Sequence, residues 1–151
     1  MKAAIWRTVR QAGFALPKPK GRKLTEAGVA SPVRHDVGEI WVARLSEDDV
    51  DESQAVDMVA GALCPDGLVS GKVARGRADL YANHAGVLLV DRHLVDAINR
   101  IDERLAIATL PPYRKVTAGD LVSSIKMMPY GIDRAALARI TAAIPFGPIT
   151  S

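Results

Sequence analysis

GRADLYANHAGVLLVDRHLVDAINRIDERLAIATLPPYRKVTAGDLVSSIKMMPY, which is Gly76–Tyr130, decides the fold of this chain. Two apolar runs, Gly86–Val90 and Leu105–Leu110, predict buried strands on either side of a helical segment at Asp91–Arg100. After a Pro-Pro-Tyr break, the short run Leu121–Met128 has a strand pattern. The stretch therefore predicts strands and helices that share one core.

Three aspartates mark where helices begin. Asp51 is an N-cap for a helix at Glu52–Leu63, which carries an apolar stripe at i, i+3 and i+4 spacing. Asp91 is the N-cap of the helix that ends at Arg100 in the central stretch. Asp133 in the same way caps a last helix at Arg134–Ala143. The caps predict at least these three helices.

The remaining segments predict shorter elements. Apolar and β-branched residues predict a strand at Glu39–Leu45 and another at Leu68–Arg75. The polar segment Gly76–His84 predicts a loop or the beginning of a short helix. Residues 1–16 have apolar positions near helical spacing, and their element type stays open. Lys18–Lys23 is a basic turn, either a solvated loop or an anion contact.

Length and composition bound the fold class. The chain has 151 residues, of which 48% are hydrophobic and 25% are charged, as in ordinary globular domains with a core. We expect a single α+β domain over residues 1–151, with a loose segment at 1–16 and a tail at 145–151. Its elements predict a mixed sheet of about five or six short strands and about three or four helices.

Charge is distributed unevenly along the chain. Residues 1–35 carry a net charge of +7, residues 36–66 carry −8, and residues 67–151 carry +4. A basic arm beside an acidic segment favours pairing within or between molecules, so we expect no nucleic-acid partner, which needs one uncompensated basic face. Aromatic residues make up 5% of the chain, too few for a base-stacking platform.

The sequence predicts a cytoplasmic protein. No run approaches the ~18 apolar residues that a membrane helix needs, so we expect no membrane association. Met1–Ala15 lacks the continuous apolar region of a signal peptide. Cys64 is the single cysteine and has no internal disulfide partner, which fits a reducing compartment.

Motifs of catalysis and metal binding are missing from the sequence. There is no GxxxxGK[ST], GxGxxG, HExxH or GxSxG, and Cys64 has no CxxC partner. His35, His84 and His93 lie far apart and lack metal-ligand spacing. We therefore expect no catalytic residue, no metal site and no autonomous enzyme activity, although a stand-alone enzyme of pterin or nucleotide metabolism is a third alternative.

Several phrases together resemble one protein family. They are GRADL (76–80), AGVL (85–88), VDAIN (95–99), ATLPPY (108–113) and SIKMMPY (124–130), preceded by KGRKLT (20–25) and IWVARL (40–45). Their order and spacing resemble the N-terminal region of bacterial molybdopterin-binding proteins of the molybdenum cofactor biosynthesis group, over about residues 18–130. The resemblance implies molybdopterin as cofactor and a molybdenum-cofactor biosynthesis protein or molybdoenzyme as partner.

The resemblance implies a site for a phosphorylated pterin. Arg75, Arg77 and Lys126 lie in the matched segments and suit a phosphate, because arginine binds oxyanions bidentately and lysine acts as a point charge. Asp79 and Asn83 are placed to bond the amino and ring nitrogens of the pterin. Lys126 lies among apolar neighbours, so its ammonium must reach water, a carboxylate or an anionic ligand.

Two kinds of module fit these residues. In the family, the recognised cofactor-binding fold lies downstream of the matched region, and its phosphate loop is not in this sequence. The first expectation is therefore an accessory module that holds the phosphorylated pterin or docks a cofactor-handling partner. The alternative is a structural or oligomerisation module without a small-molecule site, in which the basic arm of one subunit pairs with the acidic segment of another.

Overall fold

The computed structural model describes residues 6–9, 40–43, 45–128, 130–144 and 149–150. The chain divides into two units, residues 1–46 and 47–151. In the first unit, β1 (Trp6–Val9) pairs antiparallel with β2 (Ile40–Ala43). The strand β2 confirms the strand expected at Glu39–Leu45. The strand β1 lies within residues 1–16, for which the sequence left the element type open. The basic turn at Lys18–Lys23 lies outside the described residues, and one domain over 1–151 stays a prediction.

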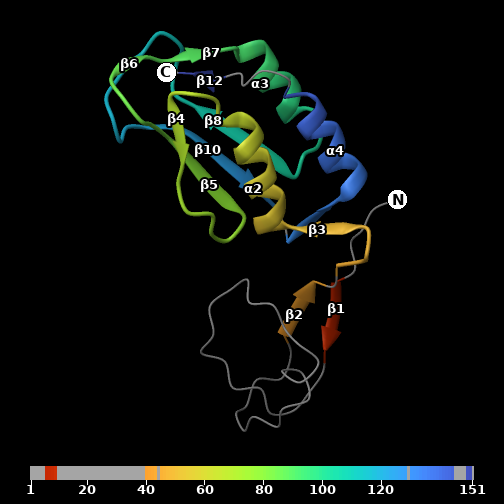
Figure 1. Ribbon diagram of the computed structural model, residues 1–151. Coiled ribbons are helices and arrows are strands. Elements are labelled where there is room, and N and C mark those ends of the chain that lie inside the picture. The colour runs from red at the N-terminus through yellow and green to blue at the C-terminus, as the bar shows by residue number, and fades with distance from the viewer. Residues whose placement is uncertain (1–5, 10–39, 44, 129, 145–148, 151) are drawn as a thin grey trace, which may run out of the picture. The chain divides into compact units, whose positions relative to one another are not determined.

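The second unit contains most of the elements, coloured from yellow to blue in Figure 1. In chain order they are β3 (Asp49–Asp51), α2 (Glu52–Leu63), β4 (Leu68–Ser70), β5 (Arg77–Ala82), β6 (Gly86–Val87), β7 (Leu89–Val90), α3 (Arg92–Asn99), β8 (Leu105–Thr109), β9 (Lys115–Val116), β10 (Leu121–Met127), β11 (Gly131–Asp133), α4 (Arg134–Ala142) and β12 (Ile149–Thr150). Three helices and several sheets of short strands confirm the α+β class.

The strands do not form the single mixed sheet that was expected. Every ladder among the described residues is antiparallel. The largest sheet has four strands in the order β4-β5-β10-β8, and the other ladders are two-stranded. A short connection, residues 71–76, joins β4 to β5, and such connections produce antiparallel pairs. The other neighbouring strands lie farther apart in the sequence, and they too run antiparallel.

All three expected helices form, and aspartate caps each of them. Oδ1 of Asp51 accepts the amide hydrogens of Ser53 and Gln54, both at 3.1 Å. Asp91 accepts from the amide of Leu94, and Asp133 from that of Ala136. A carboxylate at this position satisfies donors that the first helical turn leaves unpaired. The helix boundaries predicted from the sequence agree with the structure to within one residue.

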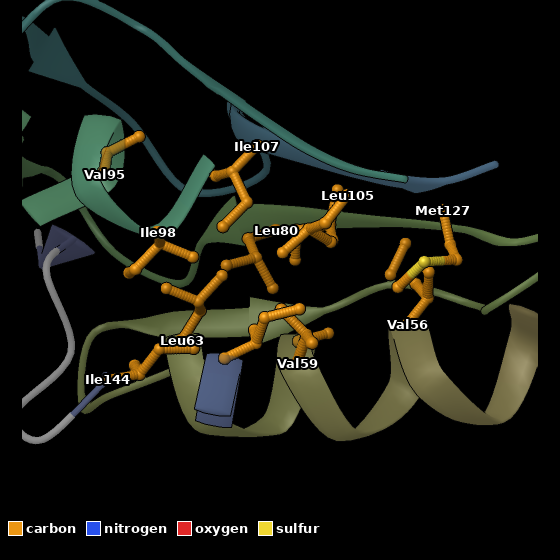
Figure 2. Close-up of a cluster of buried hydrophobic side chains, with 14 of the residues drawn as sticks. Val56, Val59, Leu63, Leu80, Val95, Ile98, Leu105, Ile107, Met127 and Ile144 are labelled. Atoms are coloured by element: carbon orange, nitrogen blue, oxygen red, sulfur yellow. The ribbon is translucent and has the colours of Figure 1, made fainter. Parts of the chain in front are cut away.

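The core lies between the helices and one face of the four-stranded sheet, which α2 crosses in Figure 1. The apolar stripe of α2 is fully buried and includes Val56, Val59 and Leu63. Figure 2 shows these side chains pointing from α2 toward the sheet, where Leu80 and Met127 belong to the same cluster. Burying a side chain of this kind stabilises the fold by about 1.5–3 kcal/mol.

The segment Gly76–His84 is a correction: it is neither a loop nor a helix. Residues 77–82 form β5, a central strand of the sheet. Arg75 and Gly76 make the tight turn before it, both with positive φ, and Ala74 and Arg77 exchange two backbone hydrogen bonds across the turn. Two consecutive residues with positive φ define a type I′ hairpin. The strand predicted at Leu68–Arg75 consequently ends at Ser70.

The run Gly86–Val90 also differs from its prediction as one buried strand. It splits into β6 and β7, which pair with β9 and β12 respectively. Of its side chains only Leu88 is fully buried, because it lies between the two ladders. The pairing of β7 with β12 also gives the expected tail at 145–151 a short strand, Ile149–Thr150.

Candidate functional site

The face of the four-stranded sheet that points away from the core carries most of the side chains singled out from the sequence. In β5, Ala78, Leu80 and Ala82 are buried, and the residues between them are half-buried or exposed. The strand β10 alternates in the same way after its first residues. The helices contribute their apolar side chains to the opposite face, so we name this one the open face. An antiparallel sheet tolerates this arrangement because one face packs and the other is solvated.

The register arranges the open face in three rows across the strands. The cation row contains Arg77, Lys126 and Ala106, the middle row contains Asp79, Ser124 and Ala108, and the apolar row contains Val69, Tyr81 and Leu121. Successive rows are two residues apart along a strand, which corresponds to about 7 Å. Charge is thus concentrated at one end of the face and apolar surface at the other.

Arg77, Asp79 and Ser124 form one hydrogen-bonded group across β5 and β10. Nε of Arg77 donates to Oδ1 of Asp79 at 3.0 Å, and its Nη2 donates to the Ser124 hydroxyl at 3.1 Å. The Ser124 hydroxyl in turn donates to the same Asp79 oxygen at 2.6 Å. Burial alone raises the pKa of Asp79, but the hydrogen bonds from Ser124 and Arg77 and the charge of Arg77 hold that pKa below its usual range. Asp79 is therefore an ionised carboxylate that fixes the arginine.

Lys126 lies beside Arg77 and is held by the hairpin turn. Its Nζ donates to the backbone carbonyl of Arg75 at 2.8 Å. The ammonium thus reaches a backbone carbonyl at the end of the sheet, at an exposed position. An ammonium has three donors, so two remain for other acceptors. Gly76 keeps the turn close to the sheet, because a Cβ there would lie 3.0 Å from the carbonyl oxygen of Met127.

Tyr81 occupies the apolar row with its ring beside Gly71, the residue that follows β4. A Cβ on Gly71 would lie 2.8 Å from Cε2 of Tyr81, so the ring uses the space that this glycine leaves open. The amide of Gly71 donates to the carbonyl of Asp79 at 2.8 Å, which keeps the backbone in place below the ring. The ring position therefore depends on residue 71.

The structure brings four of the five predicted site residues to one end of the sheet. Arg77, Asp79 and Lys126 share the open face, and Arg75 lies in the adjoining turn with its side chain exposed. Asn83 lies just beyond the other end of β5, six positions after Arg77, which corresponds to about 20 Å along an extended strand. Asn83 is therefore not part of the charged end.

Sequence reasoning missed Ser124 and Tyr81. Both follow from the period of two that strands impose, since Ser124 lies two positions before Lys126 and Tyr81 two positions after Asp79. Tyr81 was overlooked because Gly76–His84 was assigned to a loop or the beginning of a short helix, in which a period of two has no meaning. Ser124 lies in the predicted strand Leu121–Met128, and the pairing of β10 with β5 is what brings it to Asp79.

A second charged cluster, the Arg104 cluster, was also missed. Nη2 of Arg104 donates to Asp102 at 2.7 Å and to Asp133 at 2.8 Å. Hydrogen bonds from Arg104 lower the pKa of both carboxyls, against the effect of burial, and those same contacts raise the pKa of Arg104. Because Asp133 is also the N-cap of α4, the cluster ties that helix to the segment before β8. We regard it as structural.

The described part of the chain holds no group of three or more His, Cys, Asp and Glu side chains that suits a metal ion. His84 and His93 are both exposed, and Nδ1 of His84 lies 3.2 Å from the carbonyl oxygen of Ala85. Cys64 is a free thiol whose pKa is raised by burial, against a hydrogen bond from the backbone of Ser70. A raised pKa keeps a thiol protonated and weakly nucleophilic.

Among the described helices, none combines the length and the apolar character that crossing a bilayer requires. Comparison with known protein families, with curated proteins and with solved structures finds no match to this chain. The site is therefore defined by its own geometry: two cationic side chains, one ionised carboxylate, a hydroxyl and an aromatic ring on one face of the sheet, with a third cation in the adjoining turn.

Proposed function

We propose that this chain is a cytoplasmic molybdenum-cofactor accessory module that holds a phosphorylated pterin, molybdopterin, on the open face of its sheet. The observation that carries the proposal is the cross-strand pair of Arg77 and Lys126. Two cations on neighbouring strands, both partly exposed, form a site for an oxyanion. The resemblance to molybdopterin-binding proteins over about residues 18–130 supplies the class of ligand.

The charge balance of this end of the sheet favours an anion. Arg75, Arg77 and Lys126 contribute three positive charges, Asp79 contributes one negative charge, and Glu52, whose side chain lies against Gly76, contributes a second, so the balance stays positive. Asp79 engages the Nε edge of Arg77 and leaves other guanidinium donors available to a ligand. The carboxylate thereby orients the arginine, whose side chain is 53% exposed and reaches solvent.

The middle and apolar rows suit the planar part of the ligand. Tyr81 presents an aromatic ring about 13 Å along the strand from Arg77, four residues away. Asp79 and Ser124 lie between the two ends and offer hydrogen-bonding oxygens. A compact polycyclic phosphate ester presents its groups in the same order: an anion, hydrogen-bonding atoms and a flat ring. Contacts of this kind would hold the cofactor in one orientation, so that a partner protein could accept it or act on it.

Titration of the full chain with molybdopterin, followed by pterin fluorescence with oxygen excluded, tests the proposal. Arg77→Ala and Lys126→Met remove one charged donor each, and we expect each to weaken binding by about tenfold or more. Arg100→Ala is the matched control, because Arg100 is exposed at the end of α3, away from the open face. Saturable binding that both site variants leave unchanged would contradict the assignment.

A further inference from the structure

Tyr113 combines an unfavourable backbone with an exposed side chain. Its φ is +64°, in the left-handed region, and its side chain is 79% exposed. A bulky residue in that region is a steric outlier, and such outliers cluster at functional positions. Its amide donates to the carbonyl of Leu88 at 2.7 Å, and the amide of Leu88 donates to the carbonyl of Arg114 at 2.8 Å. The fold therefore holds the ring outward, with little burial to offset the strain.

The neighbours of Tyr113 make a mixed apolar and cationic surface. Val87 and Leu89, on either side of Leu88, are 50% and 51% exposed. Val87 pairs directly with Lys115 in the β6–β9 ladder. Arg114 and Lys115 are exposed and have no ion-pair partner among the described residues. We name the residues Val87, Leu89, Tyr113, Arg114 and Lys115 the tyrosine patch. Tyrosine and arginine are enriched among interface hot spots.

The outward face of α2 carries an acidic side chain, whereas the tyrosine patch carries cationic ones. Asp57, Met58 and Gly61 lie at i, i+1 and i+4, so they share one side of the helix. Met58 is 48% exposed, and Asp57 is exposed without an ion-pair partner among the described residues. We name these three residues the helix patch.

Gly61 is unexplained by the packing of the described residues. Within the described part of the chain, nothing lies within 4 Å of the position that its Cβ would take. Glycine is among the least favourable residues in a helix, so Gly61 lowers helix stability although there is room for a side chain at this position. A bare helix surface beside a methionine suits one kind of contact well, a flat aromatic ring laid on the backbone with sulfur at its edge.

We propose that the tyrosine patch of one copy docks on the helix patch of a second copy. The ring of Tyr113 covers Gly61 and contacts Met58, while Arg114 and Lys115 face Asp57. The two patches are different surfaces of the same chain, so the contact is heterologous and yields a closed ring or an open chain of subunits. The proposal does not depend on pterin binding, since neither patch includes a residue of the open face.

Sedimentation of the purified full chain over a wide concentration range tests this contact. We expect the wild type to associate with concentration and less at high salt, since Arg114 and Lys115 face an opposite charge. Tyr113→Asn keeps a residue that tolerates positive φ, and Gly61→Gln improves helix propensity while covering the helix patch. Each is expected to fold with a melting temperature no lower than that of the wild type, and to associate at least about 30-fold more weakly.

Mixing the two variants gives the sharper test. Tyr113→Asn keeps an intact helix patch, and Gly61→Gln keeps an intact tyrosine patch, so a heterologous contact predicts one-to-one dimers that grow no further. A wild type that stays monomeric would overturn the proposal and leave the patches to a different partner. Association that persists in both variants, or a mixture that remains monomeric while the wild type associates, would overturn it equally.

Discussion

The Ser124 hydroxyl and the Asp79 carboxylate are joined across β10 and β5 by a hydrogen bond of 2.6 Å. The same carboxylate oxygen accepts a hydrogen bond from Nε of Arg77 at 3.0 Å. A serine on one strand and an aspartate on the next therefore fix the direction of an arginine whose outer edge remains exposed. This preorganised arginine, with Lys126 beside it, is the centre of the proposed anion site.

The first prediction concerns the acid stability that Asp79 contributes. Because its pKa is lowered in the folded state, this contribution is complete above the unfolded pKa, about 3.9, and is lost as the pH falls through the folded pKa. We expect Asp79→Asn to be less stable than the wild type by up to about 1 kcal/mol at pH 7, since Arg77 is half exposed.

Urea unfolding of both proteins between pH 2 and pH 7 checks this prediction. The difference in free energy of unfolding should narrow as the pH falls below the unfolded value, because the wild-type carboxylate becomes protonated. A difference that stays constant over this range would mean that the ionised form of Asp79 does not stabilise the fold.

The second prediction concerns the Arg104 cluster. Arg104→Met keeps much of the side-chain volume but leaves Asp102 and Asp133 without their shared cation. Each contact is a charge-assisted hydrogen bond in a partly buried setting, so we expect a loss of about 2 kcal/mol. Thermal unfolding measures it, with Arg100→Ala as the exposed control, expected to change stability by less than about 0.5 kcal/mol. If both substitutions change the free energy of unfolding by the same amount, the contacts of Arg104 with Asp102 and Asp133 do not stabilise the fold.

The third prediction concerns the outer edge of β8. The side chain of Asn99 donates to the carbonyl of Ile107 at 2.9 Å and accepts its amide hydrogen at 2.8 Å, as a neighbouring strand does. Asn99→Leu leaves both groups unpaired, which we expect to cost about 1–3 kcal/mol. Amide hydrogen exchange at Ile107 should accelerate, and the uncovered edge should promote aggregation. Unchanged protection of that amide would show that the side chain does not serve as a strand partner.

The fourth prediction concerns Gly71 and Tyr81. Gly71→Ala places a methyl group 2.8 Å from the present position of the tyrosine ring, so the ring must move. We expect overpacking to cost about 1–2 kcal/mol and pterin binding to weaken if the ring is its platform. In a double-mutant cycle, Gly71→Ala should become nearly neutral in a Tyr81→Ala background. Additive effects would show that the two residues do not interact.

The helices could be predicted from the sequence because their signals are local. Asp51, Asp91 and Asp133 each precede an apolar stripe, and a cap and its helix lie within a few residues of each other. The strand β10 was found in the same way from its own composition. These elements fix the α+β class.

The remaining errors share a cause, since they depend on partners distant in sequence. Residues 77–82 form a strand because β10, more than forty residues later, pairs with them, and their polar side chains concealed this. The division of 86–90 depends on β9 and β12. Likewise Lys126 and Arg77 were singled out separately, but only the register of β5 with β10 makes them one site and adds Ser124 to it.

The most direct test of the account is a map of ligand contacts on the isotope-labelled full chain, recorded by NMR during titration with molybdopterin. Glycerol phosphate, which has the anion but no ring, is the parallel titration. We predict that both ligands shift the amide signals of Arg77 and Lys126, and that only the pterin also shifts those around Tyr81. Shifts confined to other surfaces, or none at saturating pterin, would contradict the open face as the binding site.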